Sequence, residues 1–177
     1  MKAERTIIPA LFAATLCFSA CSSSTPQSTV PVAGSGSIKL QRSGTGFKQA
    51  ENDRVKVSEA SLQAVNFDGN YYVRWTFAIQ PRQASVLSSL RIEDVTGPAS
   101  MVLVNDVAPQ LENGFWRENA GLMDVSSPAI AWLADPKESV RIFKFTIGEP
   151  GGQSYVLYQG VVQSPATKAA IRRMVSR

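Results

Sequence analysis

The stretch YYVRWTFAIQ, from Tyr71 to Gln80, decides the fold because apolar and polar side chains alternate along it. Successive side chains of a strand point to opposite faces of a sheet, whereas an amphipathic helix repeats every 3.6 residues. One face collects the side chains of Tyr71, Val73, Trp75, Phe77 and Ile79. The alternation therefore predicts a β-strand with one buried side.

The residues before this strand predict its hairpin partner. Val55 to Val65 has the composition of a strand, but its apolar phase slips between Val57 and Ala60, which is typical of a β-bulge. Asp68 to Asn70 then supplies the residues of a tight turn. We expect an antiparallel pair joined at this turn.

Further segments of strand length follow, with no long helical pattern between them. They are residues 87–95, 101–104, 141–147 and 155–162, and the last two are joined by a turn at 149–152. Residues 101–104 are apolar enough for a central strand, and residues 155–162 are apolar on both faces, which predicts cover on both. This succession predicts an all-β fold, an antiparallel sandwich of immunoglobulin or fibronectin type, with a small β-barrel as the alternative.

One helix is expected after the last strand, because Ser164 is a good N-cap and Pro165 suits the first helical position. Its apolar stripe consists of Ala170, Ile171, Met174 and Val175. Its other side carries Lys168, Arg172, Arg173 and Arg177. This basic side either touches acidic lipid head groups or forms a solvated face that complements the helix dipole, and the second interpretation is favoured.

The N-terminal residues have the order of a secretory signal. A charged start with Lys2 and Arg5 precedes an apolar run over residues 6–16, and small residues lead up to Cys21. The run is too short for a membrane-spanning helix, which needs about 20 apolar residues. Residues 1–20 are therefore expected to be a removable signal peptide.

The tetrapeptide Phe18, Ser19, Ala20 and Cys21 resembles the lipobox of bacterial lipoproteins, although Phe18 stands where that motif usually has Leu. The resemblance implies that Cys21 is diacylated, freed by a dedicated peptidase and acylated again. It also implies, from Ser22 in place of Asp, sorting to the outer membrane, facing the periplasm. The alternative is an ordinary secreted protein cleaved near Ala20.

Residues 22–46 are rich in Ser, Thr, Gly, Pro and Gln and contain few bulky apolar side chains. Such a segment buries too little apolar surface to offset the entropy of ordering. We therefore expect residues 21–50 to be a lipidated, flexible tether and residues 51–177 to form the sandwich domain.

Composition excludes several classes of function. The chain has no His, and of its two cysteines Cys17 is expected to leave with the signal and Cys21 to carry the lipid. Ser-His-Asp triads, Cys-His pairs and the usual zinc ligand sets are therefore excluded. Loss of residues 1–20 removes Lys2, Arg5 and Glu4 from 18 basic and 14 acidic residues, leaving a net charge of about +3. This mild, dispersed excess gives no basic patch for nucleic acid.

The segment from Asp106 to Ser139 is the candidate binding region, because long connections in compact domains are often functional. Within it, Trp116 with Arg117 is a pair enriched at binding hot spots, and Trp132 is a second candidate. The competing interpretation is that Trp116 and Trp132 plug the open ends of the core, and it is the favoured one, since large aromatic side chains are usually mostly buried.

These observations predict a membrane-anchored lipoprotein that acts without catalysis, metal or cofactor and binds another envelope protein. The alternative is a binder of carbohydrate or lipopolysaccharide that uses Trp116 and Trp132. A small hydrolase with paired carboxylates ranks below both, since such a site needs two acids held across a cleft.

Overall fold

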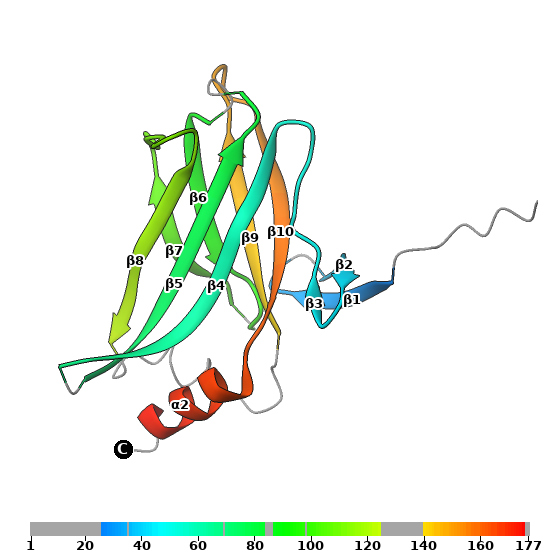
Figure 1. The fold of residues 1–177 in the computed structure, drawn as a ribbon. Helices are drawn as coiled ribbons and strands as arrows, with labels where there is room; N and C mark the ends of the chain where they lie inside the picture. Colours follow the sequence, from blue (N-terminus) through cyan, green and yellow to red (C-terminus); the bar gives the residue numbers. More distant parts are fainter. Residues whose placement is uncertain are drawn as a thin grey trace, which may run out of the picture.

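The strands of the protein form a sandwich of two facing antiparallel sheets, with a third, smaller sheet beside it (Figure 1). The computed structural model describes residues 26–34, 36–68, 70–83, 87–97, 99–124 and 140–175. One sheet has the order β4-β5-β8, formed by β4 (Val55–Phe67), β5 (Asn70–Pro81) and β8 (Trp116–Asp124). The facing sheet has the order β10-β9-β6-β7, formed by β6 (Ser89–Asp94), β7 (Met101–Asp106), β9 (Val140–Gly148) and β10 (Ser154–Val162). The all-β sandwich prediction is confirmed, and no closed barrel is present within these residues.

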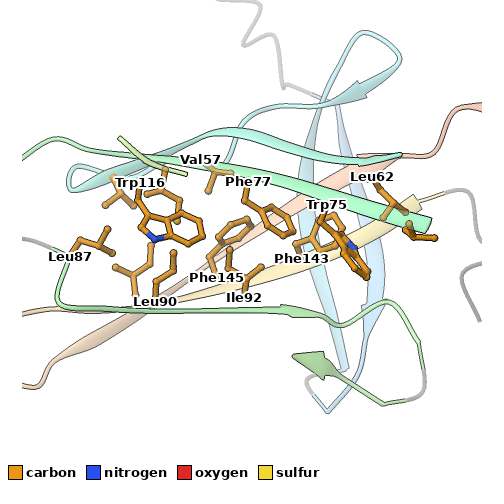
Figure 2. Close-up of a cluster of buried hydrophobic side chains, with 14 of the residues drawn as sticks. Val57, Leu62, Trp75, Phe77, Leu87, Leu90, Ile92, Trp116, Phe143 and Phe145 are labelled. Carbon is orange, nitrogen blue, oxygen red and sulfur yellow. The ribbon is translucent and has the colours of Figure 1, made fainter. Parts of the chain in front are cut away.

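The core lies between the two sheets and is built from the predicted alternation. Trp75, Phe77 and Ile79 of β5 are buried, and Phe77 makes edge contacts with Phe143 and Phe145 of β9, with ring centroids 5.1 and 5.7 Å apart. Figure 2 shows the cluster continuing along the sandwich to Trp116. Each fully buried side chain of this kind stabilises the fold by about 1.5–3 kcal/mol.

The hairpin of β4 and β5 has the predicted bulge and turn. The pairing register shifts between Val57 and Glu59, and Phe67 pairs with Asn70 across the turn. Asp68 has φ 50°, a left-handed conformation that Asp tolerates in tight turns. The bulge re-aims β4 at the edge of its sheet, which is the edge that faces β10.

The third sheet differs from the predicted flexible tether. Residues 27–47 form β1 (Gln27–Val32), β2 (Gly36–Ser43) and β3 (Gly46–Phe47). Val32 and Leu40 are buried against Val95 and Ile142, and the backbone N–H of Ala33 donates to the carbonyl of Val95 at 3.0 Å. A few well-spaced apolar side chains suffice to order this segment, because the sandwich supplies the partners. Cys21 and residues 1–20 lie outside the described residues.

The third sheet also explains why β10 has apolar residues on both of its faces. Tyr155, Leu157 and Val161 pack on the core, whereas Tyr158 packs on the cluster beneath the third sheet. The predicted cover on both faces of residues 155–162 is present in the middle of β10, at Tyr158 and Gly160, but not at Val156 and Val162, which are 41% and 42% exposed. Residues 101–104 were predicted to be central, but β7 is an edge strand, and Val102 is 45% exposed there.

A buried ion pair joins β6 to β9 at one end of the core. Arg141 donates from Nε and Nη2 to Oδ2 of Asp94 at 3.1 and 2.6 Å, and neither side chain is exposed. Asp94 also accepts hydrogen bonds from the backbone and hydroxyl of Thr96. Removing one partner of such a pair leaves an uncompensated buried charge, so the pair fixes this end of the two strands.

The helix α2 (Pro165–Val175) begins where predicted. The hydroxyl of Ser164 accepts a hydrogen bond from the backbone N–H of Thr167 at 3.0 Å, which is an N-cap. Ile171 is fully buried in the main cluster, and Arg172 and Arg173 are exposed.

Candidate functional site

The structure places Trp116 in the core rather than on a binding surface. Its side chain is 3% exposed, and its indole N–H donates to Oδ2 of Asp106 at 2.9 Å. This bond joins β8 to the end of β7, so Trp116 closes the seam between these two edge strands. The donor of the indole is therefore already used within the fold.

Arg117, the second predicted binding residue, follows Trp116 on β8, and both line a pocket of about 650 Å³ together with Asp106, Ala108, Gln110, Glu112, Glu118 and Asn119. Arg117 is exposed, and its guanidinium lies 4.9 Å from the ring centroid of Phe115. Asn113 and Gly114 form a tight turn, with φ 51° and 79°, and bring Glu112 opposite Phe115. Trp132 lies outside the described residues. Within the segment from Asp106 to Ser139, residues 116–124 form the regular strand β8, which pairs with β5.

The opposite seam, between β4 and β10, is open and forms a groove of about 650 Å³. We call it the β4–β10 groove. It lies between two edge strands, beside β3 and the start of α2. Its lining residues are Thr45, Gly46, Phe47, Gln49, Val57, Ser58, Glu59, Ala60, Gln159, Gly160, Val161, Val162, Gln163, Ser164 and Pro165.

Gln163 is the unusual side chain of this groove. It is only 4% exposed, yet neither Nε2 nor Oε1 has a hydrogen-bond partner among the described residues. Because both amide atoms lack a partner, exchanging the positions of oxygen and nitrogen would not remove the deficit. A buried polar group without a partner costs about 1–3 kcal/mol, so such groups call for an explanation.

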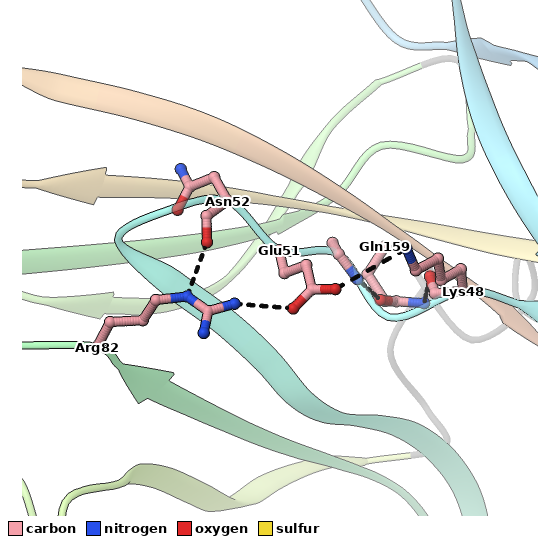
Figure 3. A network of polar contacts seen from close by, with 6 residues as sticks. Lys48, Glu51, Asn52, Arg82 and Gln159 are labelled. Atoms are coloured by element: carbon pink, nitrogen blue, oxygen red, sulfur yellow. Dashed lines mark hydrogen bonds and ion pairs between the residues drawn. The ribbon is translucent and has the colours of Figure 1, made fainter.

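Gln159, four residues before Gln163 and within β10, is a buried glutamine with a structural role. It is 6% exposed, and its Oε1 accepts from the backbone N–H of Ala50 at 2.7 Å. Its Nε2 donates to the carbonyl of Gly160 at 2.8 Å and, more weakly, to that of Lys48 at 3.4 Å. These bonds tie residues 48–50 to β10, as Figure 3 shows.

Figure 3 also shows how residues 51–52, which follow the segment 48–50, are held by Arg82. Arg82 donates from Nε to the carbonyl of Asn52 and from Nη2 to Oε2 of Glu51, both at 3.0 Å. Glu51 also lies 3.9 Å from Nζ of Lys48. The segment 48–52 is therefore held at one end by Gln159 and at the other by Arg82.

Two backbone features shape the groove. Gly160 allows the Phe47 ring to lie directly on β10, because a Cβ there would be 2.5 Å from Cδ2 of Phe47. At the β4 bulge, the side chain of Gln49 donates from Nε2 to the carbonyl of Ser58 at 2.8 Å. The seam is held open by the bulge on one side and by Phe47 on the other.

The groove has little charge. Among its described lining residues, Glu59 is the one ionisable side chain, and it is exposed. The arrangement favours a ligand that is neutral or positively charged and that offers both a hydrogen-bond donor and an acceptor to Gln163.

Comparisons with known proteins give no relative: no protein family, curated protein or solved structure matches the chain. Within the part of the chain that the structure describes, no helix is long and apolar enough to cross a membrane. The same residues contain no group of three or more acidic side chains, His or Cys that could hold a metal ion.

Proposed function

We propose that this protein is a lipoprotein of the cell envelope, anchored through Cys21, that binds an extended segment of another envelope protein in the β4–β10 groove. The anchor rests on the lipobox-like residues Phe18 to Cys21. The binding role rests on one observation, the buried amide of Gln163 without a partner at the groove wall.

An extended polypeptide is the ligand that best complements this amide. A peptide unit carries a carbonyl acceptor and an N–H donor, and a glutamine amide can bind both at once. The groove runs between two sheet edges, which are the places where extended segments add to β-proteins. The absence of basic side chains from the described lining disfavours phosphate and acidic glycans.

The carbohydrate alternative receives less support from this geometry. Its main argument was that Trp116 stacks on a sugar ring, but that side chain is 3% exposed and hydrogen-bonded. The aromatic side chain that lines the groove is Phe47, which packs on Gly160. A hydrolase with paired carboxylates would need a second acid beside Glu59, and the described lining provides none.

Site-specific photo-crosslinking tests the binding role. Val162 lines the groove and is 42% exposed, and Val102, 45% exposed on the far edge strand β7, is a matched control. With p-benzoylphenylalanine at either position, we expect a single adduct from position 162 in intact cells and none from position 102. Its linked peptide should be a neutral or basic segment of another envelope protein. A homodimer, a lipid or glycan adduct, or equal yields at both positions would contradict the proposal.

The anchor is tested separately. Cells grown with labelled palmitate should label the wild-type chain and leave Cys21→Ser unlabelled, and the wild-type N-terminal peptide should begin at an acylated Cys21. An unmodified N-terminus at or near Cys21 would instead indicate an ordinary secreted protein.

A further inference from the structure

We infer that the third sheet, β1-β2-β3, is a membrane-facing surface that lies against anionic phospholipid. This inference rests on the proposed lipid anchor at Cys21. It adds a second membrane contact and an orientation for the whole domain.

The first argument is the length of chain between the anchor and the fold. Gln27, the first residue of β1, is only six residues beyond Cys21. Six residues span at most about 20 Å even when fully extended. An acylated Cys21 therefore holds β1 within about 20 Å of the membrane, a much shorter reach than the tether of 30 residues expected from composition.

The second argument is charge. From Cys21 to Ala50 the chain carries Lys39, Arg42 and Lys48 and no acidic residue. All three basic side chains are exposed. Lys48 is partly neutralised by Glu51 at 3.9 Å. Lys39 alternates with the buried Leu40 and so faces outward, whereas Arg42 is exposed on the same side of β2 as Leu40. Lys39 therefore carries most of the effect. Basic side chains close to an anionic membrane strengthen binding by about fivefold each.

The third argument is the character of the exposed face. Val32 and Leu40 point toward the sandwich, so the residues that alternate with them face outward. Thr29, Lys39 and Gln41 are exposed on this face, which suits a layer of lipid head groups. Arg42, on the side of Leu40, is held at a distance from this face by a 2.5 Å hydrogen bond from Nε to the hydroxyl of Ser28 and by stacking over Phe47.

Because the third sheet is packed on β10 and bonded to Val95, it fixes the orientation of the sandwich as well as its distance. Thr45, Gly46 and Phe47 belong to this sheet or its turn and also line the β4–β10 groove. The groove is therefore held near the membrane surface, where a partner emerging from the bilayer would pass.

The helix α2 is the competing basic surface. Lys168, Arg172 and Arg173 occupy it, and its first turn has no acidic residue. It is separated from the third sheet in Figure 1 and lies at the far end of the chain from the anchor. Variants of α2 are therefore the matched control for charge.

The test uses the acylated protein in vesicles of phosphatidylcholine and phosphatidylglycerol, the latter at about one third, with a quencher on the lipid head groups. Gln41→Cys and Val107→Cys each give a single fluorophore site, since Cys17 leaves with the signal and Cys21 is acylated. Gln41 is exposed on β2, and Val107 is 77% exposed after β7, the sheet edge farthest from β10.

We expect the probe at position 41 to be quenched several-fold more than the probe at position 107. Lys39→Gln with Arg42→Gln should reduce this difference at least twofold, and so should Lys39→Glu, which leaves the contacts of Arg42 intact. Arg172→Gln with Arg173→Gln should leave it unchanged. Equal quenching at both positions, or loss of the difference only in the α2 variant, would overturn the inference.

Vesicle flotation separates the two proposals. If the purified protein carries no acyl chain and does not float, the anchor fails and the inference with it. If it floats but both probes are quenched equally, the anchor stands and the orientation is wrong. Crosslinking at position 162 tests the groove independently of either result.

Discussion

The two seams of the sandwich each contain a large, buried side chain with polar atoms. Within the part of the chain that the structure describes, these atoms have a hydrogen-bond partner at one seam and none at the other. At the β7–β8 seam, Trp116 is 3% exposed and its single donor is satisfied by Asp106 at 2.9 Å. At the β4–β10 seam, Gln163 is 4% exposed and both of its amide atoms lack a partner among the described residues. Equal burial therefore accompanies two different roles. The satisfied group stabilises the fold, whereas the unsatisfied one is the group that we propose binds the partner.

The largest expected effect is at the closed seam. Trp116→Ala removes a fully packed side chain from the core and should lower the free energy of unfolding by about 3–5 kcal/mol. Urea denaturation of this variant and the wild type measures the difference. A loss below about 1 kcal/mol would mean that the indole is not a core residue and would remove the contrast between the seams.

The hydrogen bond itself can be separated from the packing. Asp106→Ala leaves the buried indole N–H of Trp116 without an acceptor and should cost about 1–3 kcal/mol. Asp106→Asn keeps an acceptor oxygen and should recover part of this loss. If both variants are as stable as the wild type, the closed seam does not depend on this bond.

At the open seam, we expect removal of the buried polar group to keep or raise the stability rather than lower it. Gln163→Leu removes the unpartnered amide and should leave stability unchanged or raise it by about 1 kcal/mol, because no hydrogen bond is lost. Gln159→Leu, the matched control, breaks the three hydrogen bonds of a satisfied amide and should lower stability by about 1–3 kcal/mol. Equal losses in both variants would show that Gln163 is satisfied in the folded protein.

The smallest expected effect on stability concerns another unpartnered group, the hydroxyl of Tyr155 on β10. Burial, followed by the nearby charge of Glu149, raises the pKa of Tyr155 to about 12. A raised pKa favours the neutral phenol, so its contribution to stability is complete below pH 10 and is lost as the pH rises from about 10 to 12. Tyr155→Phe should flatten this part of the pH profile of stability without loss at neutral pH. An unchanged alkaline profile would contradict the assignment.

Sequence alone predicted the features that depend on local pattern. The alternation around Trp75, the slip between Val57 and Ala60 and the cap at Ser164 each need only neighbouring residues, and each is present in the structure. The third sheet was missed because its stability depends on Val95 and Ile142, which lie far along the chain.

The candidate site could not be predicted from composition for a related reason. Tryptophan beside arginine indicates a hot spot only if both are exposed, and the exposure of Trp116 is decided by its packing and by Asp106. Gln163 gives no signal in the sequence, since a glutamine after a strand is typical of a solvated surface. Its burial depends on segments that are far apart in the sequence and meet at the groove only in the folded chain. The bulge, predicted from the apolar slip, was the one local signal close to the groove.

The most direct test of the central claim measures the yield of the adduct formed by a photo-crosslinker at Val162 in the wild type, Gln163→Leu and Gln159→Leu. If Gln163 is the amide that binds the partner, Gln163→Leu should lose the adduct by about tenfold, the effect of one buried hydrogen-bonded contact, while its stability is kept or raised. Gln159→Leu should lose stability yet keep adduct formation per folded molecule. An adduct of wild-type yield in a stable Gln163→Leu protein would contradict the account.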